Sequence, residues 1–78
     1  MEAYVLVNCD AGKSWRIAET ALKVKNVKMA HAVTGQYDVV AFVEFADMDA
    51  LAGILAKFQT MEGVDRTHTA VAIPPKHK

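Results

Sequence analysis

Apolar and polar residues alternate with two different periods along this chain, and the succession of these periods predicts its elements. Residues 3–9 (AYVLVNC) are apolar and rich in β-branched side chains, but the stretch is too short for a stable helix, so we expect a strand. Residues 14–24 (SWRIAETALKV) place apolar side chains, Trp15 first among them, on one broad side. This period predicts a helix that begins at Ser14, a favourable N-cap residue.

Two strands joined by a turn follow this helix. Residues 27–34 alternate with period two, which predicts a strand with Val27 and His31 on the same face. A glycine turn at residues 35–36 then leads into a second apolar stretch over residues 37–45 (YDVVAFVEF). Strands separated by a short glycine-containing turn form an antiparallel hairpin, which is what we expect here.

The rest of the chain predicts a second helix and a fourth strand. Asp47 is the expected N-cap of the helix, whose apolar side chains recur at helical spacing. This apolar stripe consists of Met48, Leu51, Leu55 and Phe58. Residues 64–73 (VDRTHTAVAI) supply the strand, and the prolines that follow predict a flexible tail at residues 74–78.

The order of the expected elements is strand, helix, strand, strand, helix, strand. This split βαβ pattern predicts an α+β protein with the ferredoxin-like fold, a four-stranded antiparallel sheet with both helices on one face. We see no linker and no shift in composition along the chain, so residues 1–78 are expected to form a single domain.

The stretch at residues 37–45 is apolar on both faces. One face carries Tyr37, Val39, Ala41, Val43 and Phe45, and the other carries Val40 and Phe42. Two helices cover only one face of a sheet, and large exposed apolar patches are rare on monomers. We therefore expect an obligate homodimer formed sheet to sheet. The alternative is a sheet that curls and hides its back face within one chain.

Composition and charge narrow the classes of function. The 78 residues are 53% hydrophobic, and nine basic side chains balance nine acidic ones. A core of this size benefits from a partner, and the lack of net positive charge argues against direct binding of nucleic acid. We expect no membrane partner and a cytoplasmic location, because the apolar runs are short and no basic segment opens the chain. A single cysteine, Cys9, agrees with a reducing compartment.

The residues that could serve catalysis or metal binding lack the sequence spacing that such sites need. Residues 11–14 (AGKS) resemble the end of a phosphate-binding loop, but Val7 stands where that loop needs a glycine. Cys9, His31 and His68 fall on three different expected strands and lack the close pairing of metal ligands. A cysteine nucleophile with a histidine base stays open as an alternative. We expect no metal, no cofactor and no catalytic residue.

Two polar groups fit a small zwitterion. Asp38 stands at the entrance of an apolar strand, where aspartate is disfavoured, and its carboxylate could accept hydrogen bonds from an ammonium group. Thr67 and Thr69 are two residues apart in a strand and therefore offer hydroxyl groups on one face. The alternative is that residues 35–38 form an ordinary hairpin turn and that the threonines only favour a strand.

The segments at residues 34–45 (TGQYDVVAFVEF) and 61–73 (MEGVDRTHTAVAI) together resemble the effector-binding module of the Lrp/AsnC family of transcriptional regulators. The resemblance extends over residues 3–73. Regulators of this family carry an N-terminal helix-turn-helix domain, whereas this sequence starts directly at the first expected strand. The resemblance therefore implies a stand-alone member without its own DNA reader.

The same resemblance implies how the module assembles and binds. Family members form dimers through the sheet face and then rings, commonly octamers or decamers, with an amino acid bound between dimers. The glycine turn would supply main-chain amides and a wall, its acid would take the ligand ammonium, and the threonine strand would offer hydroxyl groups. Carried over to this chain, the ligand-binding residues are Gly35, Gln36, Tyr37, Asp38, Thr67 and Thr69.

Three hypotheses of function follow. The first is a non-enzymatic amino-acid sensor whose ligand alters its own assembly or a mixed assembly with full-length Lrp/AsnC regulators. The alternative from another class is a small dimeric α+β barrel enzyme, of the monooxygenase or isomerase type, with His31 or His68 in its cavity. The third is a structural subunit that caps the rings of a longer paralogue and binds no ligand.

Overall fold

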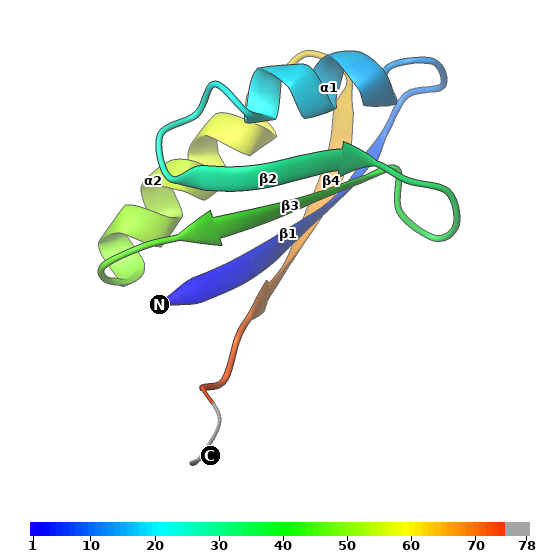
Figure 1. Ribbon diagram of the computed structural model, residues 1–78. Helices are drawn as coiled ribbons and strands as arrows, with labels where there is room; N and C mark the ends of the chain where they lie inside the picture. Colours follow the sequence, from blue (N-terminus) through cyan, green and yellow to red (C-terminus); the bar gives the residue numbers. More distant parts are fainter. Residues whose placement is uncertain (75–78) are drawn as a thin grey trace.

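A computed structural model of the chain describes residues 1–74 and has the expected order of elements. The elements are β1 (Glu2–Cys9), α1 (Ser14–Ala21), β2 (Val27–Ala32), β3 (Val39–Glu44), α2 (Met48–Gln59) and β4 (Val64–Val71). The strands pair antiparallel in the order β2-β3-β1-β4 (Figure 1). This confirms the ferredoxin-like fold. Of the tail expected at residues 74–78, all but Pro74 lies outside the described residues.

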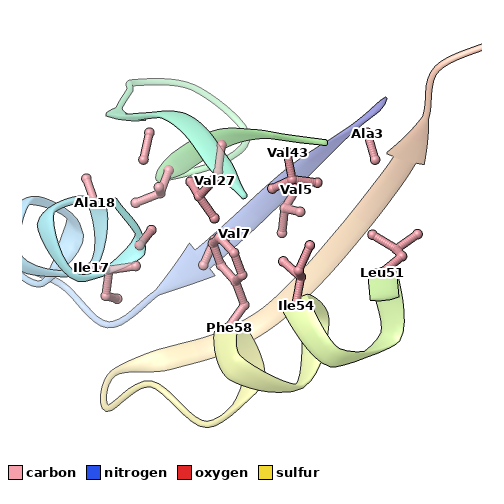
Figure 2. Packing of buried hydrophobic residues seen from close by; sticks show 14 of the residues in the cluster. Ala3, Val5, Val7, Ile17, Ala18, Val27, Val43, Leu51, Ile54 and Phe58 are labelled. Atoms are coloured by element: carbon pink, nitrogen blue, oxygen red, sulfur yellow. The ribbon is translucent and has the colours of Figure 1, made fainter. Parts of the chain in front are cut away.

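Both helices pack on one face of the sheet, and the core lies between them and the two central strands. Val5 and Val7 of β1 and Val39 of β3 are fully buried there. Figure 2 shows Ile17 of α1 and Phe58 of α2 pointing toward this layer from two sides. Because apolar burial is the main stabilising term in folding, this single layer supplies most of the stability of the monomer.

A β-bulge in β2 changes which residues face the helices. The register with β3 shifts between Val27 and Met29, and the next buried residue after Val27 is Ala30, three positions along. A bulge inserts one extra residue and so reverses the alternation beyond it. The prediction that Val27 and His31 share a face is therefore wrong, because Val27 faces the helices and His31 is exposed on the opposite side.

The first helix is shorter than the sequence predicts. Lys13, rather than Ser14, occupies the N-cap position, and no side chain caps this end. The helix ends at Ala21 instead of Val24, and Trp15 is 76% exposed although we expected it on the core side. The core residues of α1 are Ile17, Ala18 and Ala21. With eight residues, α1 makes only two turns and can bury only a narrow stripe.

The second helix follows the prediction at its start but not along its whole stripe. Asp47 is the N-cap, and its Oδ1 accepts a hydrogen bond from the Ala50 amide at 2.8 Å. Leu51, Ile54 and Phe58 are buried, whereas Met48, in the first turn of the helix, is 58% exposed. None of the helices in the described part of the chain has the length and apolar character needed to cross a membrane.

Candidate functional site

The connection between β2 and β3 is a six-residue loop, residues 33–38, rather than a two-residue turn. Strand β3 begins at Val39, two residues later than predicted. The loop is closed at its base by the Val33 amide, which donates to the Asp38 carbonyl at 2.9 Å. Gly35 near its tip has φ +119°, a conformation that side-chain-bearing residues rarely adopt.

Asp38 fastens this loop to β1. Its amide donates to the Val7 carbonyl at 2.8 Å, and its Oδ2 accepts from the Cys9 amide at 2.8 Å. The pairing of β1 with β4 shifts register between Asn8 and Cys9, and a bulge of this kind takes an amide out of the regular ladder. The Asp38 carboxylate supplies the acceptor that the Cys9 amide needs there.

Asn8 provides a further anchor that the sequence analysis missed. Its Nδ2 donates to the Gln36 carbonyl at 2.9 Å and so holds the loop near its tip. Asparagine is uncommon inside a strand, and its position between apolar neighbours was the available signal. The partner on the loop is a main-chain carbonyl, which no sequence pattern identifies.

Tyr37 lies on the face of the sheet that the helices leave open. Its ring centroid is 5.5 Å from that of His68, with an interplanar angle of 65°. Leu6 of β1 alternates with the buried Val5 and Val7, so its side chain points away from the helices. His68 pairs directly with Leu6 and therefore lies on the same open face. The prediction that Tyr37 shares a face with Val39 is wrong, because Tyr37 belongs to the loop and not to the strand.

Thr67 and Thr69 lie on the other face of β4. They pair with Val7 and Val5, whose side chains are buried against the helices, and residues directly opposite on neighbouring strands share a face. Thr67 Oγ1 accepts a weak hydrogen bond of 3.4 Å from Gln59 Nε2 of α2. A single chain therefore brings Gly35, Gln36, Tyr37 and Asp38 together in one loop but does not bring the threonines onto the face that Tyr37 occupies.

Cys9, whose amide bonds to Asp38, is the candidate nucleophile that the sequence leaves open. Burial raises the pKa of the Cys9 thiol, and the negative charge of the Asp38 carboxylate, with that of Asp10, raises it further. A thiol held in its protonated form is a poor nucleophile. Residues 1–74 contain no group of three His, Cys, Asp or Glu side chains placed to hold a metal ion.

Surface cavities lie away from the predicted ligand residues. One of about 500 Å³ is lined by Met1, Asn26 and Phe45 among others, at the end of the sheet opposite the loop. Another, of about 580 Å³, lies between Trp15 and the β2 end, where Val33 and Thr34 line it. Neither of these two cavities is lined by Asp38, Thr67 or Thr69, so a site built on these three residues needs further walls.

One family of known proteins matches almost the whole chain. A family model described as the Lrp/AsnC ligand binding domain matches residues 2–76. The HTH-type transcriptional regulator FL11 of Pyrococcus furiosus is 28% identical over 71 residues, which are 91% of this chain and 47% of the regulator. The chain thus spans about half the length of the curated relatives it matches.

Solved structures agree with the family match. The protein TTHA0845 from Thermus thermophilus superposes with a TM-score of 0.90 at 28% identity, covering 99% of this chain and 98% of that chain. The L-Met complex of the transcriptional regulator NMB0573 from Neisseria meningitidis gives a TM-score of 0.79 at 21% identity, covering 99% of this chain and 52% of that chain. At 21% identity the second likeness shows the fold alone. Because the family model matches residues 2–76, nearly the whole chain, the chain belongs to the Lrp/AsnC family and represents the ligand-binding domain of these transcription regulators.

Proposed function

We propose that this domain is a cytoplasmic, non-enzymatic sensor that binds a small amino acid between dimers. The ligand then changes the assembly of the domain itself or of mixed assemblies with full-length Lrp/AsnC regulators. The observation that carries the proposal is the state of the Asp38 carboxylate. One of its oxygens accepts from the Cys9 amide, the Cys9 thiol lies beside the carboxylate, and no described cationic side chain forms an ion pair with it. A half-buried carboxylate without a cation beside it suits an ammonium group.

The placement of the threonines supports a site shared between chains. Thr67 and Thr69 face the helix side of β4, while the Tyr37 ring lies on the opposite face. The threonine hydroxyl groups and the loop can therefore form one zwitterion site only if they belong to two different chains. The family match is to a ligand-binding domain, and a regulator of the same fold from Neisseria meningitidis was solved as its L-Met complex, so we propose an amino acid as the class of ligand.

The open face of the sheet supports a dimer. It carries Met29, His31, Val40, Phe42, Tyr4, Leu6, His68 and Ala70. The rings of Tyr4 and Phe42 are in contact at a centroid distance of 5.1 Å with an interplanar angle of 56°, and Tyr4 is 43% exposed. A face with this many apolar side chains gains free energy when a second copy covers it.

A ring needs a second interface, because two identical faces packed around a two-fold axis form a closed dimer. Another apolar surface lies between α1 and the edge strand β2, outside the open sheet face. Its exposed large side chains are Trp15, Leu22 and Val33. We propose this surface, the α1/β2 groove, as the contact through which dimers assemble into octamers or decamers.

The enzyme alternative finds less support. It requires a cavity between sheet and helices, and that layer is filled by apolar side chains such as Ile17 and Phe58. No buried polar or charged side chain occurs among residues 1–74. His31 and His68, the residues considered for catalysis, are exposed on the opposite face of the sheet.

Native mass spectrometry tests the proposal. Spectra of the wild type are recorded alone and with each of the twenty amino acids, and ring size and bound mass are read together. We expect one or a few amino acids to add their mass to an octamer or decamer and to shift its population. Rings that ignore all twenty would favour the capping subunit, and a dimer that never assembles further would contradict the proposed ring.

A further inference from the structure

The loop at residues 33–38 is attached to the sheet in two different ways. It is hydrogen-bonded to β1, since the Asp38 amide donates to the Val7 carbonyl, the Asp38 carboxylate accepts from the Cys9 amide and the Gln36 carbonyl accepts from Asn8. Its largest side chain, that of Tyr37, is instead in contact with β4 through His68. The hydrogen bonds fix where the loop starts and ends, whereas the aromatic contact is a packing contact that can shift without breaking any of them.

His68 stands at one end of a row that crosses the open sheet face. The register places His31 of β2 opposite Val40, Val40 opposite Leu6, and Leu6 opposite His68. Neighbouring side chains in such a row touch across the strands. The row therefore begins and ends with an exposed histidine, one on each edge strand. Of the two, His68 has the aromatic contact with the loop.

We propose that the contact between Tyr37 and His68 couples the ligand loop to the sheet face through which two chains associate. The inference rests on the proposed function, because it takes Tyr37 as a wall of the ligand site and the open sheet face as the dimer interface. In this arrangement one aromatic ring touches the ligand on one side and a residue of the dimer interface on the other.

The coupling depends on one side chain, that of Tyr37, which contacts both the ligand and His68. A ligand held by Asp38 packs against the Tyr37 ring and selects the ring position that suits it. The edge-to-face contact then selects the matching position of His68, and with it the shape of the outer end of the row. By linkage, if the ligand tightens or loosens the dimer by some factor, dimerisation changes ligand affinity by the same factor.

Matched substitutions separate this role from a general effect of the interface. His68→Ala removes the contact with Tyr37, whereas His31→Ala removes the histidine at the other end of the same row and leaves the loop untouched. His68→Phe keeps an aromatic side chain for Tyr37 to pack against. Both histidines are exposed, so the three variants are expected to fold.

Exchange of single chains between isotope-labelled and unlabelled rings, followed by native mass spectrometry, measures the rate constant with which the sheet-to-sheet dimer opens in each variant, with and without the amino acid that the wild type binds. Calorimetry measures the affinity for that amino acid. We expect the ligand to change this constant several-fold in the wild type, in His31→Ala and in His68→Phe. In His68→Ala the ligand should still bind, but the constant should be about the same with and without it. An undiminished change in His68→Ala overturns the inference and leaves the sensor standing. A wild type that binds none of the twenty amino acids overturns both.

Discussion

The Asp38 carboxylate accepts a hydrogen bond of 2.8 Å from the Cys9 amide, which lies 29 residues earlier in the chain. The bond joins the end of the β2–β3 loop to the bulge at the end of β1. Asp38 therefore contributes to the architecture of the loop as well as to the proposed ligand site. Any substitution at this position changes both functions unless it is chosen to separate them.

Replacing Asp38 by Asn and by Ala should separate the two functions. Asn keeps an oxygen that can accept from the Cys9 amide but removes the charge, so stability should change little while amino-acid affinity falls about 10- to 100-fold, the worth of a charged hydrogen bond. Ala removes both the acceptor oxygen and the charge, so the free energy of unfolding of Asp38→Ala should drop by about 1 kcal/mol or more. Urea unfolding and calorimetry measure the two effects. Asp47→Asn, at the cap of α2, is the control and should bind normally. Wild-type affinity in Asp38→Asn would refute the ligand role.

Two glycines should respond in opposite ways to replacement by alanine. Gly35 has φ +119° with open space around the added Cβ, so Gly35→Ala strains only the backbone and should cost about 1–3 kcal/mol of unfolding free energy. Gly53 lies inside α2, also with open space, and Gly53→Ala should stabilise by about 0.5–1 kcal/mol. Thermal unfolding of both variants measures these shifts. A Gly35→Ala variant as stable as the wild type would mean that the loop has another conformation in solution.

The two proposed interfaces should fail separately. Phe42 lies in the middle of the open sheet face, so Phe42→Ser should weaken the dimer by about 2 kcal/mol, or about 30-fold in its dissociation constant. Trp15 lies in the α1/β2 groove, so Trp15→Ser should leave the dimer intact and abolish rings. Light scattering after size-exclusion chromatography distinguishes monomer, dimer and ring. Rings that persist in Trp15→Ser would show that dimers meet through another surface.

The order of the elements and most of the core could be predicted from the sequence, because hydrophobic periods record which side of an element is buried. Strand β3 illustrates this, since Val39, Ala41 and Val43, which the sequence places on one face, are all buried. The bulge after Val27 could not be predicted, because an extra residue leaves no mark of its own in the pattern. Trp15 was misplaced for a different reason: α1 has only two turns and buries the narrow stripe of Ile17, Ala18 and Ala21, and Trp15 falls outside this stripe.

The candidate site was predictable only in part. Residues 35–38 do form one loop, because a glycine and polar residues between two strands require a turn. The separation of Tyr37 from the threonines depends on where β3 begins and on how β1 pairs with β4, and both depend on contacts distant in sequence. The role of Asn8 likewise depends on a main-chain carbonyl 28 residues away.

Cys9 should react slowly with alkylating reagents. Burial, and then the nearby Asp38 charge, raise the pKa of its thiol, so less thiolate is present at a given pH than in a free cysteine. Iodoacetamide at about pH 8, near the usual thiol pKa, should therefore modify the folded protein more slowly than a free thiol. Asp38→Asn removes one of the charges and should speed the reaction. Equal rates in the two proteins would show that the carboxylate does not act on the thiol.

The same raised pKa of Cys9 has a consequence for stability. In alkaline solution the unfolded chain loses the thiol proton first, while the folded chain keeps it, so ionisation favours the unfolded state. This contribution to stability is complete below the ordinary thiol pKa of about 8.5 and is lost as the pH rises through the folded value. Urea unfolding across this range should show a decline that is smaller in Cys9→Ala, which shares every other titrating group with the wild type. Parallel curves for the two proteins would mean that the thiol is solvated in the folded state as it is in the unfolded chain.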